Sequence, residues 1–422
     1  MTSHKLRAGT VALAGLALAL AACTDDSVDV LAPKTTPVNP IFASYVALGN
    51  SITAGYQSSG INDSTQRRSY AFLLAQQMKT QFNYPALAGF GCAPPIANFQ
   101  SQIRVGGGTS GSACSLRDPA SANAVLNNVA VPGAASVDLM STSSPYSNIL
   151  TSLFLGGKPQ VIKALDAEPT FATVWMGNND VLDAAAKGVT VSSTGTSAPE
   201  IAVKTALSTP GVTPVNTFIA NYSLGINTLV KARPNVKGVL IGVVNVTAIP
   251  LLFKAQTLFN AQFKAAFDQY AGGTVTVDAS CATDATTLLS FAIVSAMRAG
   301  SLPRTVTCTK TAGQPVGDFF MLDATEQTSF NTTITGYNNY IKAKADSIGF
   351  AYLDPNVLLA QLKTSGDIPS VPNLGSATAP YGAYISLDGV HPSTLAHRAF
   401  ANAMITTINA KYGTNLATVS VP

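Results

Sequence analysis

The 422-residue sequence predicts an α/β fold in which helices cover both faces of a central, mostly parallel sheet of about five strands, with added insertions. Two observations support this prediction. Short apolar runs without alternating polar residues recur along the chain, which is typical of strands buried on both faces. Segments with helical periodicity separate these runs, and strands that alternate with helices form parallel sheets covered on both faces.

The elements follow one another in a regular order. The predicted strands are residues 44–48, 128–131, 171–176, 238–243 and 350–353. The predicted helices are residues 69–82, 159–167, 213–232, 250–270, 324–347 and 393–412. The fifth helix has one apolar stripe, made by Phe330, Ile334, Tyr337, Ile341 and Ala345. Ligands bind beyond the carboxyl ends of the strands in such sheets, so functional residues are expected there.

Two stretches do not follow the alternation. Residues 181–210 are rich in Ser, Thr and Ala, and residues 271–321 contain two cysteines and an apolar run at 288–297. We expect loops or small subdomains near the functional site. The apolar run could be a lid over an acyl pocket, but a packed helix is preferred, because helical apolar stripes usually face a core. One domain with these two insertions is predicted over residues 42–415.

The N-terminus has the features of a secretory signal. Lys5 and Arg7 precede an apolar run at residues 11–20, which is too short to span a membrane. The sequence Leu20-Ala-Ala-Cys23 follows and resembles a bacterial lipoprotein signal. That resemblance implies that residues 1–22 are removed, that Cys23 is lipidated, and that residues 23–41 form a tether. Thr24 after the cysteine favours, by the same resemblance, the outer membrane of a Gram-negative bacterium.

The other cysteines are Cys92, Cys114, Cys281 and Cys308. An even number in an exported chain predicts disulfides. Three pairings are possible, and sequence proximity favours Cys92 with Cys114 and Cys281 with Cys308. A zinc site is the competing interpretation, but the sequence has no C-x-x-C spacing, so no metal is expected.

The charge of the chain is low. The formal net charge is +4, and charged residues make up 11% of the sequence. This balance gives no indication of a nucleic-acid partner.

A histidine near the C-terminus has a carboxylate three residues before it, in Asp388-Gly-Val-His391. A histidine that moves protons near neutral pH needs such a partner on its second ring nitrogen. The competing interpretation is a surface turn, since Asp-Gly and Pro392 are common turn residues. His397 lies in the last predicted helix, and we expect it to be a surface or packing residue.

Three further candidates follow predicted strands. Ser51 follows the first strand, where it could also cap a helix; Gly133 follows the second, and Asn179 the third. The edge of the sheet would then combine a hydroxyl with backbone and side-chain N–H groups. Acyl transfer needs such donors, because negative charge develops on the oxygen of its tetrahedral intermediate.

These segments together resemble the four blocks of the SGNH, or GDSL-type, hydrolase family. The matches are Gly49-Asn50-Ser51-Ile52, then Gly133, then Gly177-Asn178-Asn179-Asp180, and finally Asp388-Gly-Val-His391. The resemblance covers most of residues 45–412 and implies a flavodoxin-like α/β/α fold.

The same resemblance implies a role for each residue. Ser51 would be the nucleophile, His391 the general base and then acid, and Asp388 the orienting carboxylate. The backbone N–H groups of Ser51 and Gly133 and the side chain of Asn179 would form the oxyanion hole. Asp180 would support its loop rather than take part in chemistry.

Two features depart from the family pattern. Asn50 stands where the family commonly has Asp, which puts one hydrogen bond near the nucleophile in doubt. The insertion around Cys281 and Cys308 lies outside the minimal pattern, so substrate specificity does not carry over. The α/β-hydrolases share the chain order Ser, Asp, His, but the sequence lacks their G-x-S-x-G turn.

The sequence therefore predicts a lipid-anchored, extracytoplasmic serine esterase that needs no cofactor or metal. Its expected partners are an ester of a lipid or an acylated carbohydrate, and the membrane. An acyltransferase or a carbohydrate O-deacetylase with the same residues is an alternative, because the sequence does not identify the acyl acceptor. A non-catalytic surface lipoprotein that binds glycan or lipid is a second alternative.

Overall fold

The computed structural model describes residues 36–112, 114, 117–143, 149–309 and 319–420. The predicted leader, the lipidation residue Cys23 and most of the predicted tether lie outside these residues. The first described element is a 3₁₀ helix, η1 (Pro40–Phe42). Within the described ranges, no helix is both long enough and apolar enough to cross a membrane.

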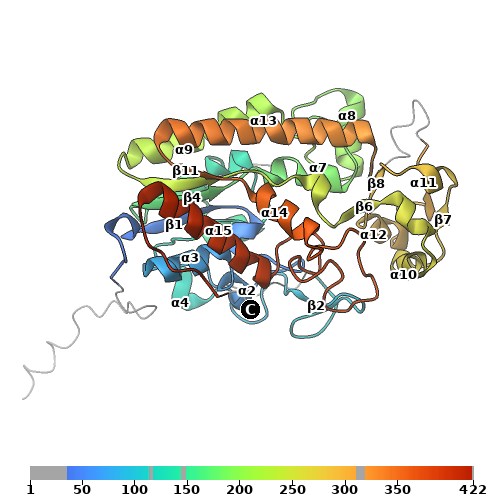
Figure 1. Ribbon diagram of the computed structural model, residues 1–422, viewed down its shortest axis with the longest axis horizontal. Helices are drawn as coiled ribbons and strands as arrows, with labels where there is room; N and C mark the ends of the chain where they lie inside the picture. The colour runs from blue at the N-terminus through green and yellow to red at the C-terminus, as the bar shows by residue number, and fades with distance from the viewer. Residues whose placement is uncertain (1–35, 113, 115–116, 144–148, 310–318, 421–422) are drawn as a thin grey trace, which may run out of the picture. The chain divides into compact units, whose positions relative to one another are not determined.

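A parallel sheet of four strands lies at the centre of the fold (Figure 1). Its order is β1 (Tyr45–Gly49), β4 (Phe171–Trp175), β5 (Lys237–Ile241) and β11 (Ala351–Leu353). Gly49 is paired with Trp175, and Trp175 is paired with Ile241. The carboxyl ends of these three strands are therefore level, and the segments that follow them meet at one edge of the sheet.

The predicted strand at residues 128–131 does not form a regular fifth strand. Asn128 makes a single parallel bridge to Ala47 of β1. Two backbone hydrogen bonds continue the pairing, from Val129 to Ala47 and from Val131 to Gly49 (3.0 and 3.2 Å). The side-chain oxygen of Asn128 accepts from Ala130 N–H, and Pro132 has no N–H to donate. The segment still runs along β1 and delivers Gly133 to the same edge as Ser51.

Both faces of the sheet are covered, as the uninterrupted apolar runs predict. Tyr45, Ala47, Phe171 and Trp175 lie in one hydrophobic cluster with residues of α3 (Tyr70–Met78) and α15 (Thr394–Tyr412). The alternate strand residues, such as Val46 and Val174, lie in the other cluster. That cluster includes residues of α6 (Gln160–Leu165), α9 (Val215–Ala232) and α13 (Ala324–Ile348).

Helix α13 shows how closely the sequence pattern describes a covering helix. Its buried residues are the five of the predicted stripe, Phe330, Ile334, Tyr337, Ile341 and Ala345. Asp323 caps its first turn by accepting from Glu326 N–H, and Gly349 ends it in a left-handed conformation. Of the six predicted helices, those at 69–82, 159–167, 213–232, 324–347 and 393–412 correspond to α3, α6, α9, α13 and α15.

The prediction of one helix over residues 250–270 is wrong in its first half. The segment contains β6 (Leu252–Lys254) and the 3₁₀ helix η5 (Ala255–Phe259), and α10 (Ala261–Ala271) begins only after them. Asn260 starts α10 because its side chain accepts from Phe263 N–H. The preceding residues instead pair as an edge strand with β8 (Leu288–Ser290).

The second insertion is a small α+β subdomain that begins before residue 271. An antiparallel sheet has the order β10 (Met321–Leu322), β8 and β6, and β7 (Thr276–Val277) pairs with β9 (Thr305–Val306). The predicted packed helix at 288–297 is divided between β8 and α12 (Ile293–Arg298). Helices α10 and α12 pack together at one end of the domain in Figure 1.

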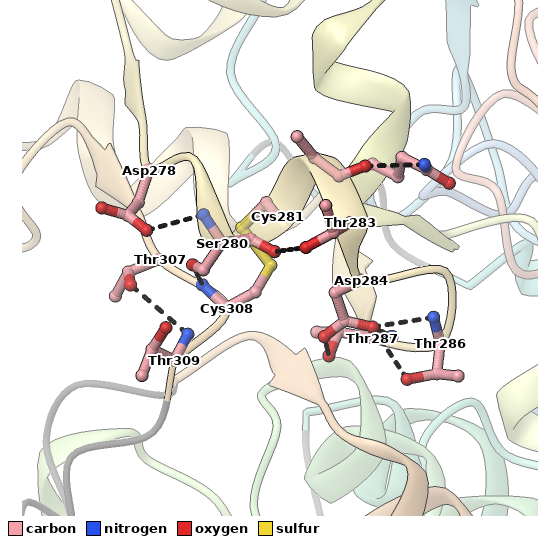
Figure 2. The surroundings of a disulfide bond; sticks show 12 residues. Asp278, Ser280, Cys281, Thr283, Asp284, Thr286, Thr287, Thr307, Cys308 and Thr309 are labelled. Carbon is pink, nitrogen blue, oxygen red and sulfur yellow. Dashed lines mark hydrogen bonds between the residues drawn. A yellow bond between two sulfur atoms is a disulfide. The ribbon is translucent and has the colours of Figure 1, made fainter.

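A disulfide joins Cys281 and Cys308 in this insertion, the pairing that sequence proximity favours. Figure 2 shows the polar contacts that surround it. Cys281 lies on α11 (Ser280–Thr283), Cys308 N–H donates to Ser280 Oγ (3.1 Å), and Asp278 accepts from Ser280 N–H (2.8 Å). The backbone on both sides of the disulfide is therefore fixed by hydrogen bonds within the insertion.

The remaining elements connect these layers. The helices are α1 (Ser51–Ala54), α2 (Asp63–Gln66), α4 (Pro119–Ala122), α5 (Ile149–Leu155), α7 (Leu182–Ala186), α8 (Ala198–Ala206) and α14 (Pro355–Thr364). A short antiparallel pair is formed by β2 (Ile96–Asn98) and β3 (Ile103–Arg104). Three 3₁₀ helices are η2 (Ser136–Leu139), η3 (Asn178–Asp180) and η4 (Val246–Ala248). The insertion predicted at 181–210 thus contains two short helices, α7 and α8.

Candidate active site

Ser51 lies at the turn between strand β1 and helix α1. Gly49, the last residue of β1, exchanges two hydrogen bonds with the side chain of Gln160, both 2.9 Å long. Asn50 is the cap of α1, and its side-chain oxygen accepts from Ile52 N–H (3.1 Å). Ser51 is therefore the first residue of a helix whose start is fixed on both sides.

The departure at Asn50 has a visible consequence. Asn50 is 1% exposed, and its amide nitrogen has no hydrogen-bond partner among the described residues. The side-chain oxygen alone provides the helix cap. An Asp at this position has two acceptor oxygens, whereas Asn50 forms a hydrogen bond only through its side-chain oxygen.

The structure brings Ser51, His391 and Asp388 into one hydrogen-bonded chain, although 340 residues separate the first two. His391 Nε2 lies 2.9 Å from Ser51 Oγ, and His391 Nδ1 lies 2.8 Å from Asp388 Oδ2. An imidazole that donates from Nδ1 to a carboxylate presents an unprotonated Nε2. This nitrogen can accept the Ser51 proton and activate the oxygen as a nucleophile.

The carboxylate of Asp388 is held by more groups than the histidine alone. Oδ1 accepts from Ser386 Oγ and from the backbone N–H groups of Val390 and His391, and Oδ2 also accepts from Ser59 N–H. Burial opposes ionisation here. The charge of protonated His391 and the hydrogen bonds from His391 and Ser59 outweigh it and hold the pKa of Asp388 well below its usual value. The carboxyl group therefore stays ionised and keeps the imidazole oriented.

Gly133 and Asn179 reach the same site from the ends of the next two segments. Both line one cavity with Ser51 and His391. Gly133 has a φ of 87°, a conformation that glycine adopts without strain. Asn179 Nδ2 donates to Ala134 O (2.8 Å), so its amide group is tied to the loop that carries Gly133.

An amide nitrogen has two N–H groups, and the bond to Ala134 uses one of them. Within the described part of the chain, the structure assigns no hydrogen bond to the backbone N–H of Ser51 or of Gly133. These three donors have the chemistry that an oxyanion requires.

Asp180 is a structural link between two of the loops. It is 1% exposed, and its carboxylate accepts from Ser136 N–H (2.8 Å) and Ser136 Oγ (2.6 Å). Burial raises the pKa of Asp180 to about 6, although both bonds from Ser136 act to lower it. The residue holds the loop after Gly133 against the loop that contains Asn179. It thus supports the loop, in line with the role the family resemblance implies.

The two described histidines differ in environment. His397 is fully buried in α15, and its Nδ1 accepts from Tyr70 N–H (3.2 Å). Its Nε2 has no hydrogen-bond partner among the described residues, and burial lowers the pKa of His397 to about 3. It is a neutral packing residue, the second of the two alternatives expected from the sequence.

The cavity beside Ser51 has a volume of about 570 Å³. Tyr56, Ala93, Pro132, Leu150 and Leu182 supply most of its apolar lining. No Asp, Glu, Lys or Arg is among the described residues that line it, and burial raises the pKa of Tyr56 to about 12, so this side chain is neutral. The cavity is therefore suited to a neutral, largely apolar group.

The first disulfide also borders this cavity. Cys92 is bonded to Cys114, again the pairing that sequence proximity favours, and both residues line the cavity. A second cavity, of about 470 Å³, lies on the insertion side of Asp388 and is lined by Phe99, Phe291 and Tyr381 among others. The insertion reaches the Asp388 loop directly, because Leu251 N–H donates to Gly389 O (2.9 Å).

Several residues of the site were not singled out from the sequence. The ring of Tyr56 lies 4.9 Å from that of His391, and Ser59 and Ser386 contact Asp388. Serines are too common for these two to be selected by type. For Tyr56, the only indication in the sequence was its position five residues after Ser51. No group of three or more described His, Cys, Asp or Glu residues is placed to hold a metal ion.

A family model matches most of the chain. The model of the family described as GDSL-like Lipase/Acylhydrolase matches residues 45–404. This range contains Ser51, Gly133, Asn179, Asp388 and His391. No curated protein is significantly similar to the chain.

Several solved structures are similar over most of their length. An extracellular lipase from Streptomyces rimosus has 13% identity and a TM-score of 0.37, and the match covers 86% of this chain and 99% of the lipase. A mutant acetyl-xylooligosaccharide esterase from Geobacillus has 11% identity and a TM-score of 0.35, with 90% and 97% covered. Phospholipase A1 from Streptomyces albidoflavus has 14% identity and a TM-score of 0.30, with 86% and 99% covered.

Proposed function

Because the chain belongs to the GDSL-like lipase/acylhydrolase family and is a serine ester hydrolase, we propose that it hydrolyses neutral carboxylic esters through an acyl-Ser51 intermediate. The observation that carries this proposal is the distance of 2.9 Å between His391 Nε2 and Ser51 Oγ. Asp388, at 2.8 Å on the other ring nitrogen, holds the tautomer that the reaction needs.

The first half of the reaction forms the acyl-enzyme. Ser51 Oγ attacks the ester carbonyl carbon while its proton passes to His391 Nε2. The carbonyl oxygen becomes negatively charged and is stabilised by the N–H groups of Ser51 and Gly133 and by the Asn179 amide. The intermediate then collapses, and protonated His391 gives its proton to the departing alcohol.

The second half releases the acid. A water molecule gives a proton to His391 Nε2 and attacks the acyl carbon, which forms a second oxyanion at the same donors. Collapse breaks the bond to Ser51 Oγ, and His391 returns the proton to that oxygen. The carboxylic acid leaves, and the enzyme regains its starting state without a cofactor.

The lining of the cavity supports a neutral acyl group as the substrate portion next to Ser51. Apolar side chains dominate it, and burying a carboxylate or phosphate there would leave that charge unpaired. The proposed substrate class is therefore an ester with an uncharged acyl chain, carried by a lipid or an acylated carbohydrate.

Hydrolysis of p-nitrophenyl esters from acetate to palmitate tests the proposal, with a soluble form that lacks residues 1–23. We expect measurable turnover in the wild type and a loss on the order of 10⁶-fold in kcat for Ser51→Ala. Ser290→Ala removes a buried hydroxyl in the insertion and should retain turnover. Undiminished hydrolysis by Ser51→Ala would exclude the proposed nucleophile.

We propose further that Cys23 carries a lipid and that the enzyme is anchored outside the cytoplasm, in the outer membrane. The support is the sequence Leu20-Ala-Ala-Cys23 after a short apolar run. Growth with an alkyne-labelled fatty acid should label the wild type but not Cys23→Ala, and membrane fractionation should follow the label. Equal labelling of both proteins would contradict the anchor.

A further inference from the structure

A tight turn beside the Asp388 loop has an unusual composition. Gln57 and Gly60 exchange two backbone hydrogen bonds, 2.8 and 3.1 Å long. The residues between them, Ser58 and Ser59, both have a φ of 53°. Turns of this kind normally contain glycine, asparagine or aspartate, because other side chains adopt this conformation at a cost. Contacts outside the turn must therefore compensate for the strain.

Those contacts lead to the Asp388 carboxylate. Ser58 N–H donates to Ser386 Oγ (2.9 Å), and Ser386 Oγ donates to Asp388 Oδ1 (3.0 Å). Ser59 N–H donates to Asp388 Oδ2 (2.8 Å), the oxygen that also faces His391. Leu387 N–H donates back to Ser58 Oγ (3.2 Å). Three hydrogen bonds thus join the turn to the loop, and the bond from Ser386 to Asp388 connects them to the carboxylate.

Arg104 holds the turn from its other side. Arg104 Nη1 donates to Ser59 O (2.8 Å) and to Pro94 O (2.6 Å). Ile96 N–H donates to Ser58 O (2.8 Å). The β2–β3 pair therefore fixes the carbonyl groups of the turn. The N–H groups of the turn point to Ser386 and to the Asp388 carboxylate.

We propose that the Ser58–Ser59 turn, Ser386 and Arg104 form a positioning element for the carboxylate of Asp388. This inference rests on the proposed function. A carboxylate that is held by its histidine alone can rotate about its side-chain bonds. The turn donates to Oδ2 through Ser59 N–H, and through Ser58 N–H it holds the Ser386 hydroxyl that donates to Oδ1. These bonds fix the plane in which Oδ2 meets His391 Nδ1. The strain of the turn is the cost of placing a backbone N–H at that point.

The element also divides the negative charge of Asp388 among several donors. The other titratable or charged groups around Asp388 and His391, among the described residues, are Tyr56, Tyr270, Tyr381, Arg104, Arg298 and His397. Removing the Ser386 donor leaves more negative charge to interact with His391. Protonated His391 is then favoured, and the unprotonated form that the reaction needs appears only at higher pH.

Ser386→Ala tests the inference in the soluble enzyme with p-nitrophenyl acetate as substrate. We expect kcat to fall about tenfold with little change in KM, because two hydrogen bonds of the element are lost. The acidic limb of the pH–kcat/KM profile should move to higher pH, which a purely structural defect would not cause. Ser386→Thr keeps the hydroxyl and should restore both.

Two further variants separate positioning from folding. Ser393→Ala removes a hydroxyl that caps α15 from the same loop, and it should keep kcat and the pH profile. Arg104→Met should lower kcat and move the acidic limb in the same direction as Ser386→Ala.

Wild-type kcat and an unchanged pH profile in Ser386→Ala would overturn the inference. The same result would leave the proposed function intact as long as Ser51→Ala has lost hydrolysis. If Ser386→Ala does not fold, the comparison of Arg104→Met with wild type decides by the same two readouts.

Discussion

The carboxyl edge of the sheet and the insertion that carries Cys281 are built in different ways. At the edge, Ser51, Gly133 and Asn179 follow parallel segments whose ends are level, and each contributes a group to one cavity. In the insertion, the backbone hydrogen bonds of the short strands and helices are made mainly with other residues of the insertion. Its polar side chains, such as Asp278 and Asp284, bond to residues two or three positions away.

Chemistry and stability depend on different regions of this chain. Hydrogen bonds at the edge join distant residues, as His391 to Ser51 and Asp180 to Ser136. Around the second disulfide, Asp278 and Thr283 bond to residues two or three positions away, and the bond from Cys308 N–H to Ser280 Oγ stays within the insertion (Figure 2). Substitutions at the edge should therefore change turnover, whereas matched substitutions in the insertion should change stability. The predictions below test this division in order of decreasing effect.

The largest contrast is expected between two carboxylates. Asp388→Asn should lower kcat by about 10⁴-fold, because the neutral amide no longer holds His391 in the reactive tautomer. Asp284→Asn replaces a carboxylate that accepts four bonds from Thr286 and Thr287 with an amide that has one acceptor oxygen, and it should retain turnover. Steady-state hydrolysis of a p-nitrophenyl ester measures both. A loss of turnover in Asp284→Asn that is comparable to that in Asp388→Asn would break the comparison.

The next contrast is between two asparagines. Asn179→Ala should lower kcat by about 10²–10³-fold, the usual effect of removing one oxyanion donor. Asn260→Ala removes the cap of α10 and should cost about 1 kcal/mol of stability without a change in kcat. Kinetics and thermal unfolding distinguish the two effects. Full turnover in Asn179→Ala would show that its amide is not a donor to the oxyanion.

The two disulfides sharpen the comparison, since they close loops of 22 and 27 residues. Removing either pair by Cys→Ser substitution should lower the free energy of unfolding by about 3–4 kcal/mol, because the unfolded chain gains conformational entropy when the loop is no longer closed. Loss of the Cys281–Cys308 bond should leave kcat/KM unchanged in the folded fraction. Loss of the Cys92–Cys114 bond should alter the acyl-chain preference, because both cysteines line the cavity. Identical chain-length profiles for the two variants would contradict this assignment.

The smallest contrast is in pH dependence. Burial raises the pKa of Asp180 to about 6, so between pH 4 and 6 the folded protein binds more protons than the unfolded chain. The unfolding free energy should therefore fall by about 3 kcal/mol as the pH rises through this window. Hydrogen bonds from Thr287 and Thr286 lower the pKa of Asp284, so its contribution is instead lost as the pH falls below about 4.

Denaturant unfolding at several pH values measures this dependence. Asp180→Asn should flatten the stability profile between pH 4 and 6, while Asp284→Asn should leave that window unchanged. A wild-type profile that rises with pH in this window would show that the Asp180 carboxyl is not the controlling group.

The sequence predicted the edge far better than the insertion, for a physical reason. Buried parallel strands leave an uninterrupted apolar run, and the chemistry of Ser51, Asn179 and His391 restricts the residue types allowed. The prediction of a regular strand at 128–131 was wrong because Asn128 and Pro132 reduce its pairing with β1 to a single bridge. The prediction of one helix over 250–270 was wrong because residues 252–254 pair with β8, which is distant in sequence, and this pairing overrides the local helical periodicity. Ser58, Ser59 and Ser386 could not be predicted, since their role depends on a turn conformation.

Covalent labelling with a fluorophosphonate tests directly whether His391 activates Ser51 as a nucleophile. Mass spectrometry of the wild type should show one adduct, on the peptide that contains Ser51, with ester hydrolysis lost in proportion to labelling. His391→Gln should label far more slowly, and His397→Gln, if folded, at close to the wild-type rate. Labelling at another residue, or full hydrolysis without an adduct on Ser51, would contradict the account.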